Sequence, residues 1–213
     1  MIVSNELQAY LDQHLSAVST QLKYIERQTY LNELQPHMVS GLHQGLFLKM
    51  LVHLKSAKNV LEIGTFTGFS AMAMAEALPE DGRLVTIEKD VEMAAKAQAN
   101  FNKSSQSYKI NLRVGDAIDL LDEILDSTYF DLVFIDADKA KNLEYYQTIL
   151  PRVLSGSLIL IDNVLWKGKV MDAKVNDKTT QFFRELNDTI AADERVVACI
   201  LPIRDGMWFI QKK

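Results

Sequence analysis

The sequence predicts an α/β fold in which helices pack on both faces of a mostly parallel sheet. From Lys58 onward, short runs of Val, Ile and Leu alternate with helical stretches, the pattern of parallel strands joined by crossover helices. The last two apolar runs are linked by only a short connection, and such a connection can join only antiparallel strands. We therefore expect a doubly wound sheet with an antiparallel C-terminal strand.

The N-terminal part carries helical periodicity, interrupted at Pro36. We expect residues 1–55 to form a helical extension and residues 56–213 to form the core of one domain, since no repeat or linker divides the chain. The apolar side chains of the extension exceed what one sheet face needs, which favours a homodimer. The expected helices span 5–14, 16–34 and 42–54, and these apolar residues include Phe47, Leu48, Met50 and Leu51.

The core elements follow from apolar runs bounded by turn residues and from helical stretches between them. Five strands should be parallel, and two more close the chain through Pro202 to Gly206. The expected strands are 59–63, 83–88, 110–115, 130–135, 157–161, 195–201 and 207–211. The expected helices are 69–78, 90–102, 117–125, 139–150 and 177–191.

Composition excludes several classes of function. The formal charge is -5 and no block of Lys or Arg is present, which argues against nucleic acid as a partner. No apolar run approaches the roughly 20 residues that span a bilayer, and the N-terminus lacks the features of a signal peptide. We expect a cytoplasmic protein without membrane contact. The single cysteine, Cys199, lies in an apolar run and is expected to be an inert core residue.

A glycine-bearing turn follows the first expected strand. Gly64 and Gly68 would let the backbone approach a ligand closely, and Ser70 opens the next helix. The spacing differs from the G-x-G-x-x-G that cradles a pyrophosphate. Glu88 ends the second strand about 20 residues later, where a carboxylate can accept hydrogen bonds from both hydroxyls of a ribose. Together with the small residues after the third strand, these features favour an adenosine ligand without phosphates, although Glu88 has a plain alternative as a capping carboxylate.

Two acidic segments end the fourth and fifth strands. Asp136, Asp162 and Asn163 offer two carboxylates and an amide oxygen, which suit a hard divalent cation better than zinc. Three protein ligands leave about three octahedral positions open, enough for two vicinal substrate oxygens and one water. Lys139 is one helical turn or less from Asp136 and can take the proton of a hydroxyl. Asp138 is expected to cap a helix and is left out of the metal set.

The stretch Val60 to Ser70, together with Glu88, Gly115 to Ala117, Ile135 to Lys139 and Asp162 to Trp166, resembles the metal-dependent O-methyltransferases of the catechol and caffeoyl-CoA type. The resemblance runs from Met38 to the terminal hairpin. It implies a Rossmann-like, seven-stranded sheet whose last strand is inserted antiparallel. It also implies transfer of the methyl group of S-adenosylmethionine to a phenolic oxygen of a small molecule.

The resemblance also implies a bound cation and the roles of individual residues. The cation is preferably Mg2+, with Mn2+ or Ca2+ as alternatives. Phe66 and Phe69 stand where tyrosine is common in relatives, and Gln44 stands where many plant members carry glutamate, so the acceptor is left open. The implied cofactor-contacting residues are Met38, Ser40, Glu62, Gly64, Ser70, Glu88, Ala117 and Asp136; the metal ligands are Asp136, Asp162 and Asn163; the catalytic residues are Lys139, as the base, and Asp136.

Two other classes of function compete with methyl transfer. A Rossmann-like NAD-dependent oxidoreductase is disfavoured by the glycine spacing and by the acidic strand ends. A non-catalytic adenosine-binding protein would have no reason to keep Asp136, Lys139, Asp162 and Asn163 together. Trp166 follows the metal-ligand turn and is expected either to wall a dry substrate pocket or to fill the core.

Overall fold

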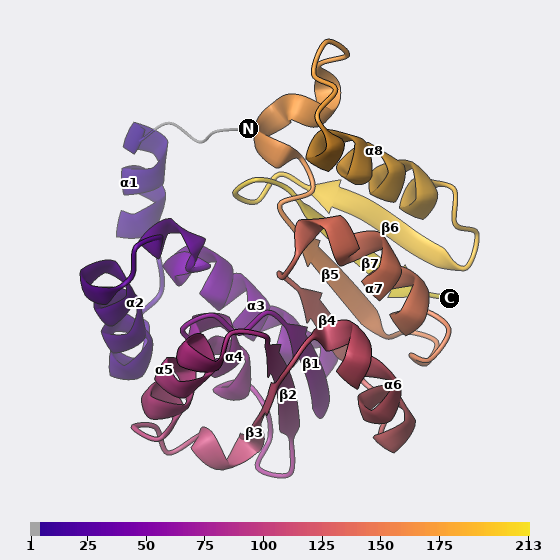
Figure 1. Cartoon of the computed structure of the whole chain (residues 1–213). Coiled ribbons are helices and arrows are strands. Elements are labelled where there is room, and N and C mark those ends of the chain that lie inside the picture. The colour runs from indigo at the N-terminus through magenta and orange to yellow at the C-terminus, as the bar shows by residue number, and fades with distance from the viewer. Residues whose placement is uncertain (1–4) are drawn as a thin grey trace. The chain divides into compact units, whose positions relative to one another are not determined.

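The structure is a computed structural model that describes residues 5–213. The chain divides into two compact units, one that ends at Ala117 and one that begins at Ile118. The strand order is β3-β2-β1-β4-β5-β7-β6 (Figure 1), and the predicted mostly parallel, seven-stranded sheet flanked by helices is confirmed. The single-domain organisation stays a prediction.

The first unit contains the helical extension and three strands. Its elements are α1 (Asn5–Gln13), α2 (Thr20–Asn32), the 3-10 helix η1 (Pro36–Met38), α3 (Gly41–Lys55), β1 (Asn59–Ile63), α4 (Phe69–Ala75), β2 (Arg83–Glu88), α5 (Val91–Phe101), the 3-10 helix η2 (Ser107–Lys109) and β3 (Ile110–Val114).

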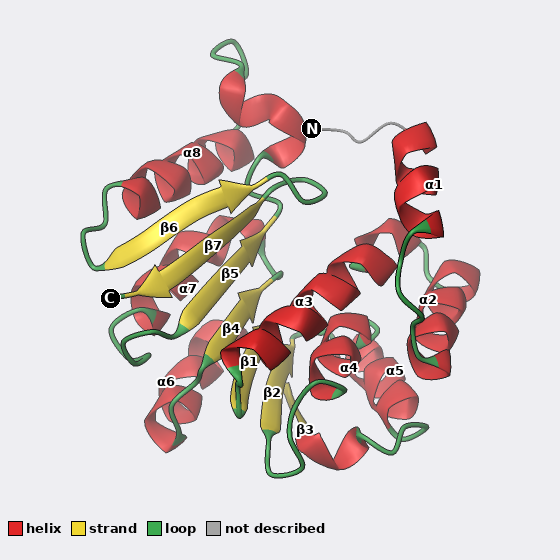
Figure 2. Cartoon of the chain, turned by 180° about the vertical axis from the view of Figure 1, so that it is seen from behind, coloured by secondary structure: helices red, strands yellow, loops and turns green. Residues whose placement is uncertain are grey.

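The three strands of this unit are parallel, with Val60 opposite Leu84 and Leu84 opposite Ile110. The last four residues of β1 are buried, which explains why they are apolar apart from one glutamate. Figure 2 shows α3 beside α4. Gly45 permits this close approach, because a Cβ atom at that position would lie 2.6 Å from the ring of Phe69. The carboxyl ends of all three strands therefore lie at one edge.

The helical extension is confirmed, but α2 begins at Thr20 and not at residue 16. Ser19 is the reason: its side chain accepts a hydrogen bond from Leu22 N at 3.1 Å and caps the helix. The same hydroxyl donates to Glu76 Oε1 at 2.5 Å, which fastens α2 to the residue that ends α4. Of the residues that suggested a dimer, Leu48 and Leu51 are buried, whereas Met50 is exposed.

The second unit contains four strands. Its elements are α6, which begins at the unit boundary (Ala117–Ser127), β4 (Leu132–Ile135), the 3-10 helix η3 (Lys139–Lys141), α7 (Asn142–Ile149), β5 (Leu158–Asp162), the 3-10 helix η4 (Trp166–Met171), α8 (Lys178–Ala191), β6 (Val196–Leu201) and β7 (Met207–Lys212).

In this unit β4 and β5 are parallel, and β7 is inserted antiparallel between β5 and β6. Helices α7 and α8 cover one face of these strands (Figure 1). Every residue of β4 and β5 is buried, as the apolar runs predict. Tyr145 and Tyr146 on α7 pack inside the unit, and burial raises the pKa of Tyr146, whose hydroxyl donates to Asp193 Oδ2 at 2.9 Å.

The prediction for Cys199 was wrong. The residue lies in the expected strand, β6, but its thiol is free and exposed. β6 stands at the end of the strand order, so only one of its edges is paired. Val197 and Cys199 share a face of this strand by the alternation of side chains, and both are exposed. An apolar run alone does not distinguish an edge strand from a central one.

None of the helices in residues 5–213 is long and apolar enough to cross a membrane.

We predict that Gly68→Ala lowers the free energy of unfolding more than Gly41→Ala does. Both glycines have left-handed backbones, with φ of 85° and 77°, and alanine there costs about 1–2 kcal/mol. At Gly68 a Cβ atom would also lie 2.4 Å from Phe101 Cε1, whereas at Gly41 its nearest neighbour is Glu26 Oε1 at 3.8 Å. Crowding should add about 1–3 kcal/mol at Gly68 alone.

Urea-induced unfolding of the two variants and the wild type measures this difference. Equal losses in both variants would show that backbone conformation, and not contact with Phe101, sets the cost at Gly68.

Candidate active site

The predicted site residues fall into two groups, one in each unit. The first group surrounds the turn between β1 and α4. Gly64 and Gly68 both have positive φ, 98° and 85°, so the turn needs glycine at these positions. Phe66 between them also has a left-handed backbone, with φ of 50°, which is unfavourable for a bulky residue. A turn of this kind needs support from its surroundings.

That support comes from buried hydroxyl and amide groups. Thr67 accepts a hydrogen bond from Thr29 Oγ1 of α2 at 2.8 Å through its side chain. Its carbonyl accepts from Asn100 Nδ2 of α5 at 3.0 Å. Thr29, Thr67 and Asn100 are all buried. The glycine turn is thus held from two helices, one of which belongs to the N-terminal extension.

The predicted residue Glu62 lies inside this unit with no exposed surface. Its Oε2 accepts from Thr86 Oγ1 at 2.5 Å, and Thr86 Oγ1 is also 2.5 Å from Thr65 Oγ1. A buried carboxylate requires such partners, since an isolated buried charge is costly. The chain of contacts joins the ends of β1 and β2 to the beginning of the glycine turn.

Glu88 ends β2, as predicted, and its carboxylate is engaged by the backbone. Oε2 accepts from Phe66 N of the glycine turn at 2.7 Å, and Oε1 accepts from Asp90 N at 3.0 Å. A carboxylate offers about four acceptor positions, so these two bonds leave room for two more. The Glu88 carboxylate can therefore cap the backbone and still accept hydrogen bonds from a ribose, so the two alternatives raised by the sequence are compatible.

The remaining predicted cofactor residues of this unit differ in exposure. Met38 lies in η1 and is 51% exposed, whereas Ser40, just before α3, is buried. Ser70 is buried in the first turn of α4, and Ala117 is buried where α6 begins. Small side chains at these two helix starts would let a ligand approach the backbone N–H groups there.

The second group lies at the carboxyl ends of β4 and β5. The register pairs Ile135 with Ile161, so the next residues along the two strands, Asp136 and Asp162, follow side by side. Neighbouring strands are about 4.8 Å apart. Asp162 is itself the last residue of β5 and is buried, whereas Asp136 is partly exposed. The register therefore places the two predicted acidic ligands at the carboxyl ends of neighbouring strands, and their joint role as metal ligands stays a prediction.

Lys139 lies directly against Asp136. Its Nζ is 2.5 Å from Asp136 Oδ1, and both side chains are about one fifth exposed. The expected helix over 139–150 begins with the 3-10 turn η3 and becomes α-helical only at Asn142. Asp138 caps this turn, as predicted, because its side chain accepts from Ala140 N at 3.1 Å. The short turn keeps Lys139 close to the end of β4.

Asn163 follows Asp162 in a left-handed conformation, with φ of 64°, which asparagine tolerates better than most residues. Asp162 Oδ1 accepts from Asn163 N at 2.8 Å. The carbonyl of the next residue, Val164, accepts from Asn187 Nδ2 of α8 at 3.0 Å. Asn187 Oδ1 in turn accepts from Trp208 Nε1 of β7 at 2.7 Å. The turn that carries Asn163 is thus tied to both α8 and β7.

Trp166 begins η4 and packs against Phe183 of α8, with ring centroids 5.1 Å apart. It is partly exposed, so it is neither a fully buried core residue nor a free surface side chain. The segment beyond it is held by Arg184, which donates to the carbonyls of Lys169, Val170 and Asp172. This segment therefore has a defined conformation.

Sequence reasoning missed Thr29, Asn100, Thr65 and Thr86, which support the turn without carrying a motif of their own. The threonines on either side of Phe66 were the available signal, since buried hydroxyls need partners. Their partners come from residues 21 to 38 positions away in the sequence.

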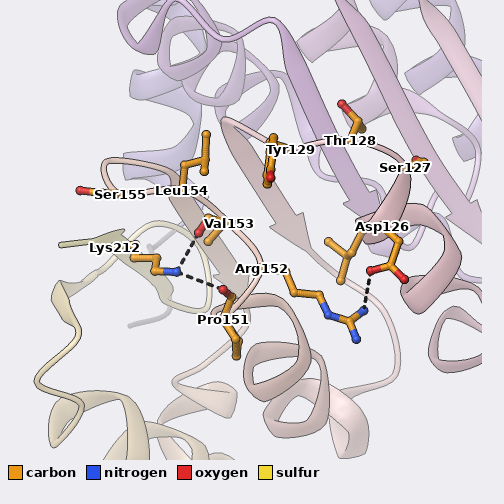
Figure 3. A pocket seen from close by; sticks show the side chains of 11 residues that line it. Asp126, Ser127, Thr128, Tyr129, Pro151, Arg152, Val153, Leu154, Ser155 and Lys212 are labelled. Atoms are coloured by element: carbon orange, nitrogen blue, oxygen red, sulfur yellow. Dashed lines mark hydrogen bonds and ion pairs between the residues drawn. The ribbon is translucent and has the colours of Figure 1, made fainter.

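Within residues 5–213, no group of three or more His, Cys, Asp or Glu side chains is arranged to hold a metal ion. The predicted set contains only two such residues, because its third member is an amide. A pocket of about 590 Å3 lies elsewhere, at the opposite ends of β4, β5 and β7 (Figure 3). Its basic side chains already have hydrogen-bond partners. Lys212 donates to the carbonyls of Pro151 and Val153, and Arg152 donates to Asp122. It is separate from the predicted residues.

The chain matches the O-methyltransferase family over residues 12–213. It is 42% identical over 161 residues to a catechol O-methyltransferase of Niastella koreensis, covering 75% of this chain and 73% of that protein. It is 37% identical over 181 residues to caffeoyl-CoA O-methyltransferase 1 of Arabidopsis thaliana, covering 80% of this chain and 70% of that protein.

Solved structures agree. An O-methyltransferase from Bacillus cereus, determined in complex with SAH, superposes with a TM-score of 0.89 at 33% identity, covering 98% of this chain and 97% of that one. The O-methyltransferase TomG from Streptomyces achromogenes, in complex with SAM, gives a TM-score of 0.89 at 31% identity, covering 98% and 96%. The resemblance that the motifs suggested is confirmed, and the chain belongs to the O-methyltransferase family.

Proposed function

We propose that this protein transfers the methyl group of S-adenosylmethionine to a hydroxyl of a vicinal diphenol held on a divalent cation. The observation that carries the proposal is the register of β4 and β5, whose last pair, Ile135 and Ile161, is followed in the chain by Asp136 and Asp162. Asn163 comes next after Asp162, and Lys139 Nζ lies 2.5 Å from Asp136 Oδ1. The names of the relatives, catechol and caffeoyl-CoA O-methyltransferases, support an acceptor of this class.

The donor set fits a hard cation. Two carboxylates and one amide oxygen are the ligands that Mg2+, Mn2+ and Ca2+ accept, and neither His nor Cys is among them. Lys139 provides a positive partner for Asp136, which indicates that this edge favours a cation. When bound, a divalent cation would lower the pKa of a phenolic hydroxyl and fix the position of its oxygen. We infer Mg2+ as the first choice.

The protein's own residues would then place and deprotonate the acceptor. In its neutral form, which a nearby dication would favour, Lys139 Nζ would take the proton of the reacting hydroxyl and become the ammonium partner of Asp136. Asp136 would keep the lysine side chain directed at that edge. Transfer combines a cationic sulfonium with an anionic oxygen to give neutral products. Placement of the two partners is therefore the main source of rate, worth on the order of 7–11 kcal/mol in favourable cases. Trp166 would help to exclude water from the pocket.

The cofactor would be held by residues of the first unit, with Asp136 as a further contact. The backbone of the glycine turn at Gly64 gives close access, and Glu88 accepts hydrogen bonds from the ribose hydroxyls. The SAH and SAM complexes of the similar structures support this cofactor. The remaining proposed contacts are Met38, Ser40, Glu62, Ser70 and Ala117.

We also propose that residues 1–213 act as one domain, that the protein is cytoplasmic and that it forms a homodimer. Met50 and Leu54, on one side of α3, are 59% and 75% exposed. Their position one helical turn apart gives an apolar stripe without cover within this chain's described residues.

A screen of acceptors tests the proposed function. Vicinal diphenols and matched monophenols are incubated with the protein, Mg2+ and S-adenosylmethionine labelled in the methyl group. Label should pass to the diphenols and not to the monophenols, because only a pair of neighbouring oxygens chelates the cation. Equal labelling of both classes, or labelling that persists with a chelator, would refute metal-held acceptor binding.

We predict that Asp136→Ala and Asp162→Ala each abolish turnover, while affinity for S-adenosylmethionine falls less. Each change removes one of three proposed metal ligands. Turnover is measured with the labelled donor, and affinity is measured by calorimetry.

The matched control is Asp138→Ala, which removes an acidic side chain two residues from Asp136 but only a helix cap, worth about 1 kcal/mol of stability. It should keep metal binding. If Asp138→Ala lost metal and Asp136→Ala kept it, the ligand assignment would be wrong.

We predict that Lys139→Ala lowers turnover by about 10^2–10^4-fold, the usual contribution of a general base, with little loss of metal affinity. Lys139→Arg should be similarly slow, because arginine keeps the ion pair with Asp136 but does not give up its proton.

Rate constants at neutral pH for both variants, beside Lys141→Ala as a neighbouring charge control, check this. Wild-type turnover in either Lys139 variant would exclude the residue as the base.

A further inference from the structure

The turn after β5 is held in an unfavourable conformation. Asn163, Trp166 and Lys167 all have left-handed backbones, with φ of 64°, 47° and 56°, and Gly168 follows with φ of 78°. Only the last is a glycine, and side-chain-bearing residues rarely adopt this conformation. Trp166 N donates to Asn163 O at 3.2 Å, which closes the turn. Contacts from elsewhere must keep these residues in place.

Those contacts come from the loop between β6 and β7. Val164 N donates to Gly206 O at 3.0 Å, and Leu165 N donates to Asp205 O at 2.9 Å. The side chain of Asp205 makes a third bond: its Oδ1 accepts from Lys167 N at 2.6 Å. Gly206 fits because a Cβ atom there would lie 2.3 Å from Leu165 Cγ. The loop and the turn are therefore closely matched.

The placement of the loop follows from the sheet. Asp162, the last residue of β5, is paired with Met207, the first residue of β7. The residues before Met207 consequently run beside the residues after Asp162, antiparallel to them. The side chain of Asp205 binds Lys167 N, near the end of the turn. Of the three hydrogen bonds between the loop and the turn, this is the one that depends on a side chain.

We propose that Asp205 is a positioning residue for the metal ligand Asn163. This inference rests on the proposed function, because it presumes that Asn163 binds the cation. By accepting from Lys167 N, Asp205 fixes the left-handed residues that end the turn, and the bond from Trp166 N to Asn163 O transmits this order to the ligand. Without the carboxylate, the turn relaxes and the amide oxygen of Asn163 leaves its place.

A second aspartate in the same connection allows the role of Asp205 to be distinguished from the general effect of a carboxylate that caps a loop. Asp172 lies in the same connection between β5 and α8, and its Oδ1 accepts from Lys174 N at 2.9 Å. It makes the same kind of bond, but the amide that it binds belongs to Lys174, outside the turn from Asn163 to Lys167. Asp172→Ala is therefore a matched control for the loss of one carboxylate and one amide contact.

The experiment is calorimetric titration of the cofactor-free, full-length protein with Mn2+. Asp205→Ala should bind at least about tenfold more weakly than the wild type, the usual loss when a residue that orients a metal ligand is removed. Asp205→Asn should stay close to the wild type, because its amide oxygen still accepts from Lys167 N. Asp172→Ala should match the wild type. Asp205→Leu, which has nearly the shape of Asp but no acceptor, should be as weak as Asp205→Ala and replaces it if the alanine variant fails to fold.

Wild-type affinity in Asp205→Ala or Asp205→Leu would overturn the proposal, as would an equal loss in Asp205→Asn, which would make charge and not the hydrogen bond responsible. If the wild type itself bound no Mn2+, the metal site of the proposed function would fail, and this inference with it. If the wild type bound Mn2+ and both Asp205→Ala and Asp205→Leu bound it equally well, only the role of Asp205 would be refuted.

Discussion

The pairing of β4 with β5 is the constraint on which the proposed chemistry depends. Parallel strands in matched register end together, so the residues that follow them are brought side by side without any contact of their own. Asp136 and Asp162 directly follow the paired residues Ile135 and Ile161 for this reason, although they are 26 positions apart in the sequence. A shift of register by one residue would turn one carboxylate to the other face. The buried apolar side chains of both strands hold the register, and so the inert core determines the reactive edge.

In the first unit, the main constraint is the irregular turn between β1 and α4, which must be held in one conformation. Glycine makes the conformation possible at Gly64 and Gly68, but it does not make it stable. Stability comes from Thr29 and Asn100, which bind Thr67, and from Glu88, which binds Phe66 N. The helical extension thus contributes to the turn through Thr29 and is more than a cover for the sheet. Family membership also leaves an NAD-dependent oxidoreductase without support.

The order of strands and helices, and the residues at the strand ends, could be predicted because they depend on periodicity and on turn chemistry close in sequence. The capping role of Asp138 is an example, since its partner is two residues away. The start of α2 at Thr20 was missed, because Ser16 and Ser19 are equivalent as sequence signals and only one caps a helix. The exposure of Cys199 and the contact of Asp205 with Lys167 depend on which strand lies at the edge and on which loop meets which turn. Both are properties of the assembled sheet, which local patterns do not contain.

The exposed thiol on β6 has a practical consequence. Cys199 is the only cysteine in the sequence, and it lies on an outer strand whose hairpin partner leads back to β5. A maleimide dye would therefore attach at one known position without any engineered substitution. The wild-type chain can thus be observed by fluorescence as it is, provided that the thiol is kept reduced until labelling, so that two such molecules do not become covalently joined through their sulfur atoms.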